Sequence, residues 1–97
     1  MSTATQTQTK TQIKVPSMWT VILHNDDYTP MDFVTQVLVH VFHLSVDEAA
    51  AIMMTVHLKG KANVGRFTKE IAQTKALMVK RLAEDQGHPL LAEPKEA

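Results

Sequence analysis

The alternation of hydrophobic and polar residues predicts a strand near the start of the chain. Residues 19–24 (WTVILH) place Trp19, Val21 and Leu23 on one side and Thr20, Ile22 and His24 on the other. Such a period of two is typical of a strand that is buried mainly on one face. The chain therefore changes at about Met18 from a polar segment to a structured one.

A period of three to four residues follows and predicts an amphipathic helix that ends at about His43. Its apolar positions are Phe33, Val34, Val37, Leu38, Val41 and Phe42. Thr29 is the expected N-cap, Pro30 suits the first helical position, and Asp32 adds negative charge to the first turn. We therefore expect the helix to begin directly after the segment NDDYT.

Two further helices and two short strands complete the pattern. Ser45 and Glu48 form a capping box for a helix that Gly60 should end. Its expected apolar face consists of Val46, Ala49, Ala50, Ile52, Met53 and Val56.

Residues 61–67 (KANVGRF) are expected to form a short strand, in which Gly65 allows either a bulge or a close backbone approach. Thr68 caps a third helix that ends near Gly87, and residues 90–92 are the last strand. The third helix carries one stripe with Ile71, Lys75, Met78 and Leu82 and a neighbouring stripe with Ala72, Ala76, Val79 and Ala83.

The element order, β-α-α-β-α-β, predicts an α+β fold. We expect a two-layer domain in which three helices cover one face of a three-stranded antiparallel sheet, while the other face stays partly exposed. The domain should occupy residues 15–97. Residues 1–14 (MSTATQTQTKTQIK) have almost nothing to bury and are expected to be a disordered tail.

Composition narrows the function classes. Ten basic and ten acidic residues give a formal net charge of zero, whereas proteins that bind nucleic acid or anionic membranes usually carry a basic excess. The absence of cysteine excludes disulfides and a thiol nucleophile, and no apolar run is long enough to span a bilayer. We expect a soluble cytoplasmic protein with no cofactor, no metal and no catalytic activity.

The most unusual segment is residues 24–33 (HNDDYTPMDF), which places polar side chains just before an apolar helix. Taken alone, NDDYTP is most simply a turn and helix cap, because Asn and Asp bond their own backbone. It does not match a calcium loop, which needs ligands at alternating positions and a glycine at the sixth. His40 and His43 have no evident third ligand and are best interpreted as surface histidines.

His57, late in the second helix, gives the polar segment a second interpretation. If the first two helices pack as a hairpin, His57 and the carboxylates converge beside Met31, Val34, Met53 and Val56. An apolar hole with a few acceptors at its mouth is typical of a ligand pocket. These acceptors suit an ammonium group attached to a hydrophobic side chain. Taken alone, a histidine at the position of His57 is more often a structural residue at the core boundary than a ligand-binding one.

Three segments together resemble the ClpS family, the bacterial adaptors that recognise N-degrons (the N-end rule) and deliver substrates to the ClpAP protease. They are VILHNDDYTPMDFV, MMTVHLKGKANVGRFTKEIAQTKA and HPLL, and the resemblance covers about residues 15–92. It implies that the bound ammonium is a protein's free α-amino group and that the apolar part is a first residue such as Leu, Phe, Tyr or Trp.

The resemblance also implies roles for individual residues. Asn25, Asp26, Asp27 and His57 would hold the α-amino group. The side-chain pocket would be lined by Leu23, Thr29, Met31, Val34, Met53, Val56 and Leu90, with Met31 as the gate against β-branched side chains.

Glu70 and Lys75 match positions that face the N-terminal domain of the ClpA unfoldase, an AAA+ protein, and a monomeric adaptor is expected. The chain has Gln73 where the family usually has Glu, and Arg66 where a small or apolar residue is usual. Both differences lie on the side expected to face the unfoldase.

Two other classes of function remain open: a structural or interaction module whose NDD turn is only a cap, and a metal-dependent hydrolase using Asp26, Asp27 and His57.

Overall fold

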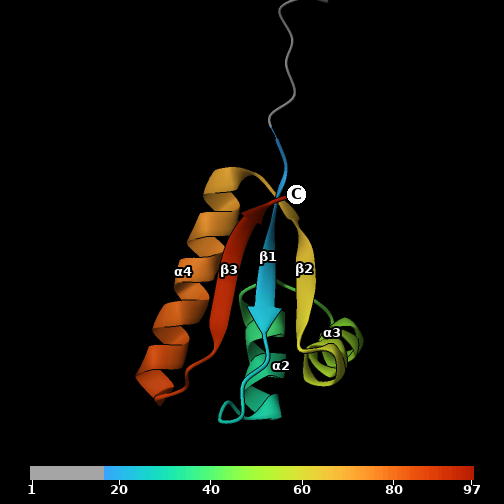
Figure 1. Cartoon of the computed structure of the whole chain (residues 1–97), viewed down its shortest axis with the longest axis vertical. Coiled ribbons are helices and arrows are strands. Elements are labelled where there is room, and N and C mark those ends of the chain that lie inside the picture. Colours follow the sequence, from blue (N-terminus) through green and yellow to red (C-terminus); the bar gives the residue numbers. More distant parts are fainter. Residues whose placement is uncertain (1–16) are drawn as a thin grey trace, which may run out of the picture.

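A computed structural model describes residues 17–97, so the predicted tail, residues 1–14, lies outside the described part. The elements follow the predicted order. They are β1 (Trp19–His24), α2 (Met31–His40), α3 (Val46–Lys59), β2 (Lys61–Phe67), α4 (Lys69–Gln86) and β3 (Leu91–Glu96). Figure 1 shows the three strands side by side, with α4 alongside β3 and with α2 and α3 near the end of β1.

The sheet is antiparallel throughout, with strand order β2-β1-β3. The central strand β1 points Val21 and Leu23 into the core, where both are fully buried. The opposite face is partly exposed: Ile22 and His24 are half-buried, although Thr20 is buried. The predicted two-layer fold with one partly wet face is therefore confirmed.

The core lies between this sheet and the three helices. The small-residue stripe of α4 is the buried one, because small side chains let the helix lie close to the sheet. Ile71, Met78 and Leu82, on the neighbouring stripe, stay about half exposed. The helices and strands contribute these buried side chains: Val21, Leu23, Val34, Val37, Leu38, Ala49, Val56, Val64, Ala72, Ala76, Val79 and Ala83.

Three boundaries differ from the sequence prediction. Helix α2 ends at His40 rather than His43, because His43 has a positive φ of 57° and the amide of Leu44 donates to the carbonyl of Leu38. Its N-cap is Pro30, not Thr29, with no side-chain cap bond. Strand β3 begins at Leu91 instead of Leu90 and continues to Glu96.

The predicted signals at α3, β2 and α4 are confirmed. The Ser45–Glu48 capping box is formed, and Gly60 ends α3 with a φ of 90°, a left-handed conformation that glycine adopts without strain. Val46 is an exception, because it is exposed rather than on the apolar face. Thr20 of β1 pairs with Arg66 of β2, and Ile22 pairs with Asn63, so β2 has one extra residue opposite Val21. The bulge therefore lies in the segment of β2 that contains Gly65.

Candidate functional site

One cavity brings together most of the side chains that the sequence singled out. It encloses about 250 Å³ between the loop after β1, helix α2 and the end of helix α3. Its walls are formed by Asn25, Asp26, Asp27, Thr29, Met31, Val34, Met53, Val56 and His57. The predicted convergence of the NDD segment and His57 is therefore present in the fold.

A backbone hydrogen bond holds the two sides of the cavity together. The amide of Asn25 donates to the carbonyl of Gly60 over 2.8 Å. Gly60 directly follows the last turn of α3, the turn that carries His57. The loop after β1 and the end of α3 are therefore fixed side by side, although they are more than 30 residues apart in sequence.

Asp26 shapes the loop with both of its carboxylate oxygens. Oδ1 accepts from the amides of Tyr28 (2.8 Å) and Thr29 (2.7 Å), and Oδ2 accepts from the hydroxyl of Thr29 (2.7 Å). Partial burial raises the pKa of Asp26, but these hydrogen bonds from Thr29 and Tyr28, together with nearby His88, outweigh it and lower the pKa below its usual value. The carboxylate is therefore ionised at neutral pH.

The cavity has a polar rim and an apolar floor. Asn25, Asp27 and His57 are exposed, whereas Val34 and Val56 at the floor are only 6% and 2% exposed. A ligand in this cavity would place its charged end among acceptors in contact with water and its apolar end among buried carbons.

Two methionines, Met31 and Met53, form part of the cavity wall. Met31 is 41% exposed, and Met53 is half-buried. Methionine has three rotatable bonds and fills irregular gaps, so this part of the wall is the most adaptable one.

Two residues predicted to line the pocket are not among the residues that line the 250 Å³ cavity. Leu23 is fully buried in the core. Leu90 is buried and faces a small hollow of about 10 Å³, which shares Asn25, Asp26, Thr29, Val34 and Val56 with the main cavity. Leu90 therefore lies next to the cavity, close to Val34 and Val56.

The two residues expected to face the unfoldase lie on α4, away from the cavity. Glu70 is exposed in the first turn of α4. Lys75 is half-buried, and its Nζ donates to the carbonyl of Val41 over 2.7 Å, directly after α2. The same ammonium lies 5.7 Å from the ring centre of Phe42. Lys75 therefore also binds α2 to α4.

The sequence did not predict that His88 packs on Phe33 and lies near Asp26. Its ring packs edge-to-face on Phe33 with centroids 4.7 Å apart, and its charge helps to lower the pKa of Asp26. No local pattern identifies this contact, because His88 follows α4, more than 50 residues after Phe33.

The candidate metal ligands are not gathered in the structure. His40 ends α2, and exposed His43 lies in the turn after it. Within residues 17–97, no three His, Cys, Asp or Glu side chains lie close enough together to hold a metal ion. In the same range no helix is long and apolar enough to cross a membrane.

Comparisons with known proteins agree on one family. A family model described as "ATP-dependent Clp protease adaptor protein ClpS" matches residues 14–93. The ATP-dependent Clp protease adapter protein ClpS of Edwardsiella ictaluri is 51% identical over 84 residues, which cover 87% of this chain and 79% of that protein. The protein of the same name from Deinococcus radiodurans is 48% identical over 92 residues, covering 93% and 81%.

A solved structure is similar in fold as well as in sequence. It is the structure of Agrobacterium tumefaciens ClpS2 bound to L-phenylalaninamide. The TM-score is 0.83 at 41% identity, and the match covers 86% of this chain and all of the other.

Proposed function

Because the chain belongs to the ClpS family of Clp protease adaptors, we propose that it binds the first residue of N-degron substrates and delivers them to the ClpA unfoldase for degradation by ClpAP. The substrates carry a free α-amino group and a bulky hydrophobic first side chain: Leu, Phe, Tyr or Trp. The observation that carries this proposal is one cavity that combines a polar rim, formed by Asn25, Asp27 and His57, with an apolar floor.

The rim has the chemistry that an α-ammonium group requires. An ammonium has three donors and a positive charge, and Asn25, Asp27 and His57 offer a carbonyl oxygen, a carboxylate and a ring nitrogen. Asp26 adds a second negative charge, but its oxygens already accept three bonds within the loop. We assign Asp26 to positioning the loop and to attracting the cation, and the other three residues to direct hydrogen bonding.

The floor has the chemistry that a large apolar side chain requires. Val34 and Val56 are buried, and Met31 and Met53 can adjust their rotamers around a ring or a γ-branched chain. A β-branched side chain carries its extra carbon next to the backbone, where it would meet Met31 in the cavity wall. Met31 is therefore the gate that excludes Ile and Val.

The structural relative supports the same ligand class. Agrobacterium tumefaciens ClpS2 is bound to L-phenylalaninamide, a molecule with a free α-amino group and an aromatic side chain. The proposal transfers this ligand class, but not a ranking among first residues, to the present chain.

The magnitudes fit a receptor that must release its cargo. Burying one large apolar side chain contributes about 1.5–3 kcal/mol, and each hydrogen bond to a charged group contributes about 1.5–3 kcal/mol. Association costs about 4 kcal/mol or more. Binding should therefore be micromolar at the tightest, and never picomolar.

Delivery requires a second surface, for which we propose the start of α4. Glu70 is exposed and can contact the N-terminal domain of ClpA. Lys75 is half-buried and already donates a hydrogen bond to the carbonyl of Val41, so it can contact ClpA only while keeping that bond. In this function the chain acts as a cytoplasmic monomer and catalyses nothing itself.

The proposal is tested by degradation of a folded fluorescent reporter by purified ClpA and ClpP. A reporter that begins with Phe should be degraded faster when the protein is added, whereas a matched reporter that begins with Ser should not. Equal effects of the protein on both reporters would contradict the proposal.

A further inference from the structure

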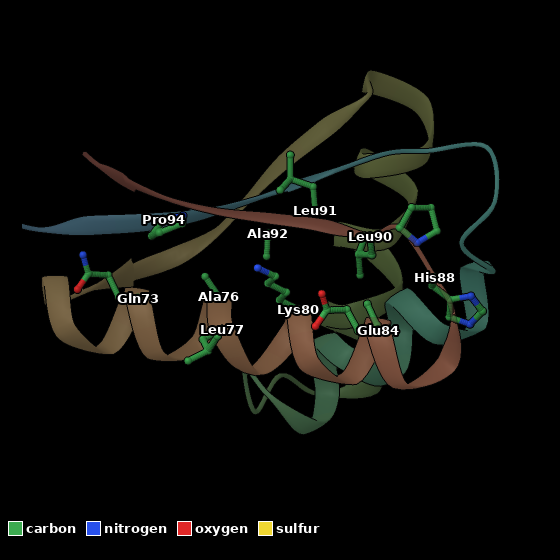
Figure 2. A pocket seen from close by; sticks show the side chains of 12 residues that line it. Gln73, Ala76, Leu77, Lys80, Glu84, His88, Leu90, Leu91, Ala92 and Pro94 are labelled. Carbon is green, nitrogen blue, oxygen red and sulfur yellow. The ribbon is translucent and has the colours of Figure 1, made fainter.

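A second hollow, the α4–β3 groove, lies beside the candidate site. It encloses about 460 Å³ and is mostly apolar. Figure 2 shows Gln73 and Pro94 at one end, His88 at the other, and Ala76 facing Ala92 between them. Along one side of α4, spacings of three and four residues place Gln73, Leu77, Lys80 and Glu84 on its wall.

The groove begins where the candidate site ends. Leu90 lines both the groove and the small hollow that adjoins the cavity. His88, at the same end, influences the carboxyl group of Asp26 through its charge. A polypeptide whose first residue occupied the cavity would therefore need only a few more residues to reach the groove.

The shape of the groove suits an extended chain. One wall is a helix, and the other is β3, an edge strand that pairs only with β1. An edge strand has free backbone groups that can pair with an added strand whatever its side chains. The wall from Gln73 to Glu84 is roughly 16 Å long at 1.5 Å per helical residue, about the length of five extended residues.

We infer that the α4–β3 groove holds the segment that follows the first few residues of a bound N-degron substrate, as an extended chain with apolar side chains. This inference rests on the proposed function. The groove wall carries both Lys80 and Glu84, so charge does not select the segment. Selection comes from apolar contacts with residues such as Leu77, which is 45% exposed.

The test uses three peptides that share the same first five residues, beginning with Phe. The first peptide ends there, the second continues with seven residues that alternate Leu and Ser, and the third continues with seven residues of Gly and Ser. We expect the wild-type protein to bind the second peptide about fivefold more tightly than the third, because partial burial of one or two leucines contributes this much. The first and third peptides should bind equally.

Leu77→Glu should bind the second peptide no more tightly than the third. Its affinity for the first peptide should be unchanged, and this result would also show that the variant is folded. Val46→Glu is the matched control, since Val46 is 68% exposed on α3 and is not on the groove wall; it should keep the advantage. Equal binding of the second and third peptides, or an advantage that survives Leu77→Glu, would overturn the inference. Failure of the first peptide to bind would instead overturn the proposed function.

Sedimentation of the free protein distinguishes a competing occupant. We expect the same monomeric sedimentation for the wild type and Leu77→Glu. Self-association that Leu77→Glu abolishes would show that a second copy fills the groove, and would overturn the inference.

Discussion

Replacing Asp26 by Asn should destabilise the fold in a manner that depends on pH. The asparagine oxygen can still accept from the amides of Tyr28 and Thr29, but its NH₂ group cannot accept from the hydroxyl of Thr29. The remaining bonds also lose their charge. Hydrogen bonds to charged groups contribute about 1.5–3 kcal/mol, and partial exposure reduces this. We expect a loss of about 1–2 kcal/mol in the free energy of unfolding at pH 7.

The pH dependence follows from the lowered pKa of Asp26. Because folding lowers this pKa, the carboxylate stabilises the folded state fully at pH values well above its ordinary value of 3.8, and the stabilisation is lost as the pH falls through the folded value. The difference between wild type and Asp26→Asn should therefore be constant from pH 7 to about pH 5 and shrink towards pH 3.

Urea unfolding of both proteins across this pH range measures the difference. Asp27→Asn is the matched control, because Asp27 is exposed and its side chain makes no hydrogen bond within residues 17–97; it should change stability by less than about 0.5 kcal/mol. Equal stability of wild type and Asp26→Asn at pH 7, or a difference that does not change with pH, would refute the assignment of Asp26 to the loop.

Four further perturbations test other parts of the account. Met31→Ala should admit peptides beginning with Ile or Val while changing Leu less; titrations that show an unchanged preference for Leu would exclude Met31 as the gate. A ring nitrogen of His57 can accept a hydrogen bond from the ligand's ammonium group, so His57→Ala should bind a peptide that begins with Phe more weakly than the wild type at pH 8; an unchanged affinity would make His57 structural. Lys75→Met should lower the free energy of unfolding by about 1–2 kcal/mol, since the carbonyl of Val41 loses a charged donor; unchanged urea unfolding would contradict this. Removing residues 1–14 should leave peptide binding intact and impair degradation by ClpAP, because the polar composition of this segment is of the kind that an unfoldase can grip; unimpaired degradation would leave the segment without this role.

The sequence predicted most of the fold because its signals are local. The capping box at Ser45, the stop at Gly60 and the cap at Thr68 each depend on residues within four positions. The predicted end of α2 was wrong because it depends on contacts between residues far apart in the sequence. Val41 and Phe42 continue the apolar period, but they are buried in a turn after the helix, beside the ammonium of Lys75 from α4.

Strand β3 shows the same limit. Residues 93–96 (EPKE) have no apolar alternation, so the sequence predicted a strand that stops at Ala92. The strand continues because β1 provides a partner, with Trp19 opposite Glu96. Pro94 is tolerated because β3 is an edge strand.

The site was predictable to the extent that it depends on one helix hairpin. The periodicity of the two helices predicted that His57 lies next to the NDD segment, and both line the same cavity. The sequence could not separate Asp26, which is engaged by Tyr28 and Thr29, from exposed Asp27. It also could not show that Leu23 and Leu90 are absent from the lining of the cavity, because depth within a core depends on the packing of all the layers.

The central claim is that the cavity recognises a free α-amino group, and acetylation of that group tests it most directly. Two fluorescent peptides that begin with Phe and differ only in an N-terminal acetyl group are titrated with the wild-type protein at pH 8. Acetylation removes the positive charge and two donors from the polar rim, so the acetylated peptide should bind at least about 100-fold more weakly. Affinities of the two peptides within about twofold of each other, less than one hydrogen bond contributes, would contradict the account.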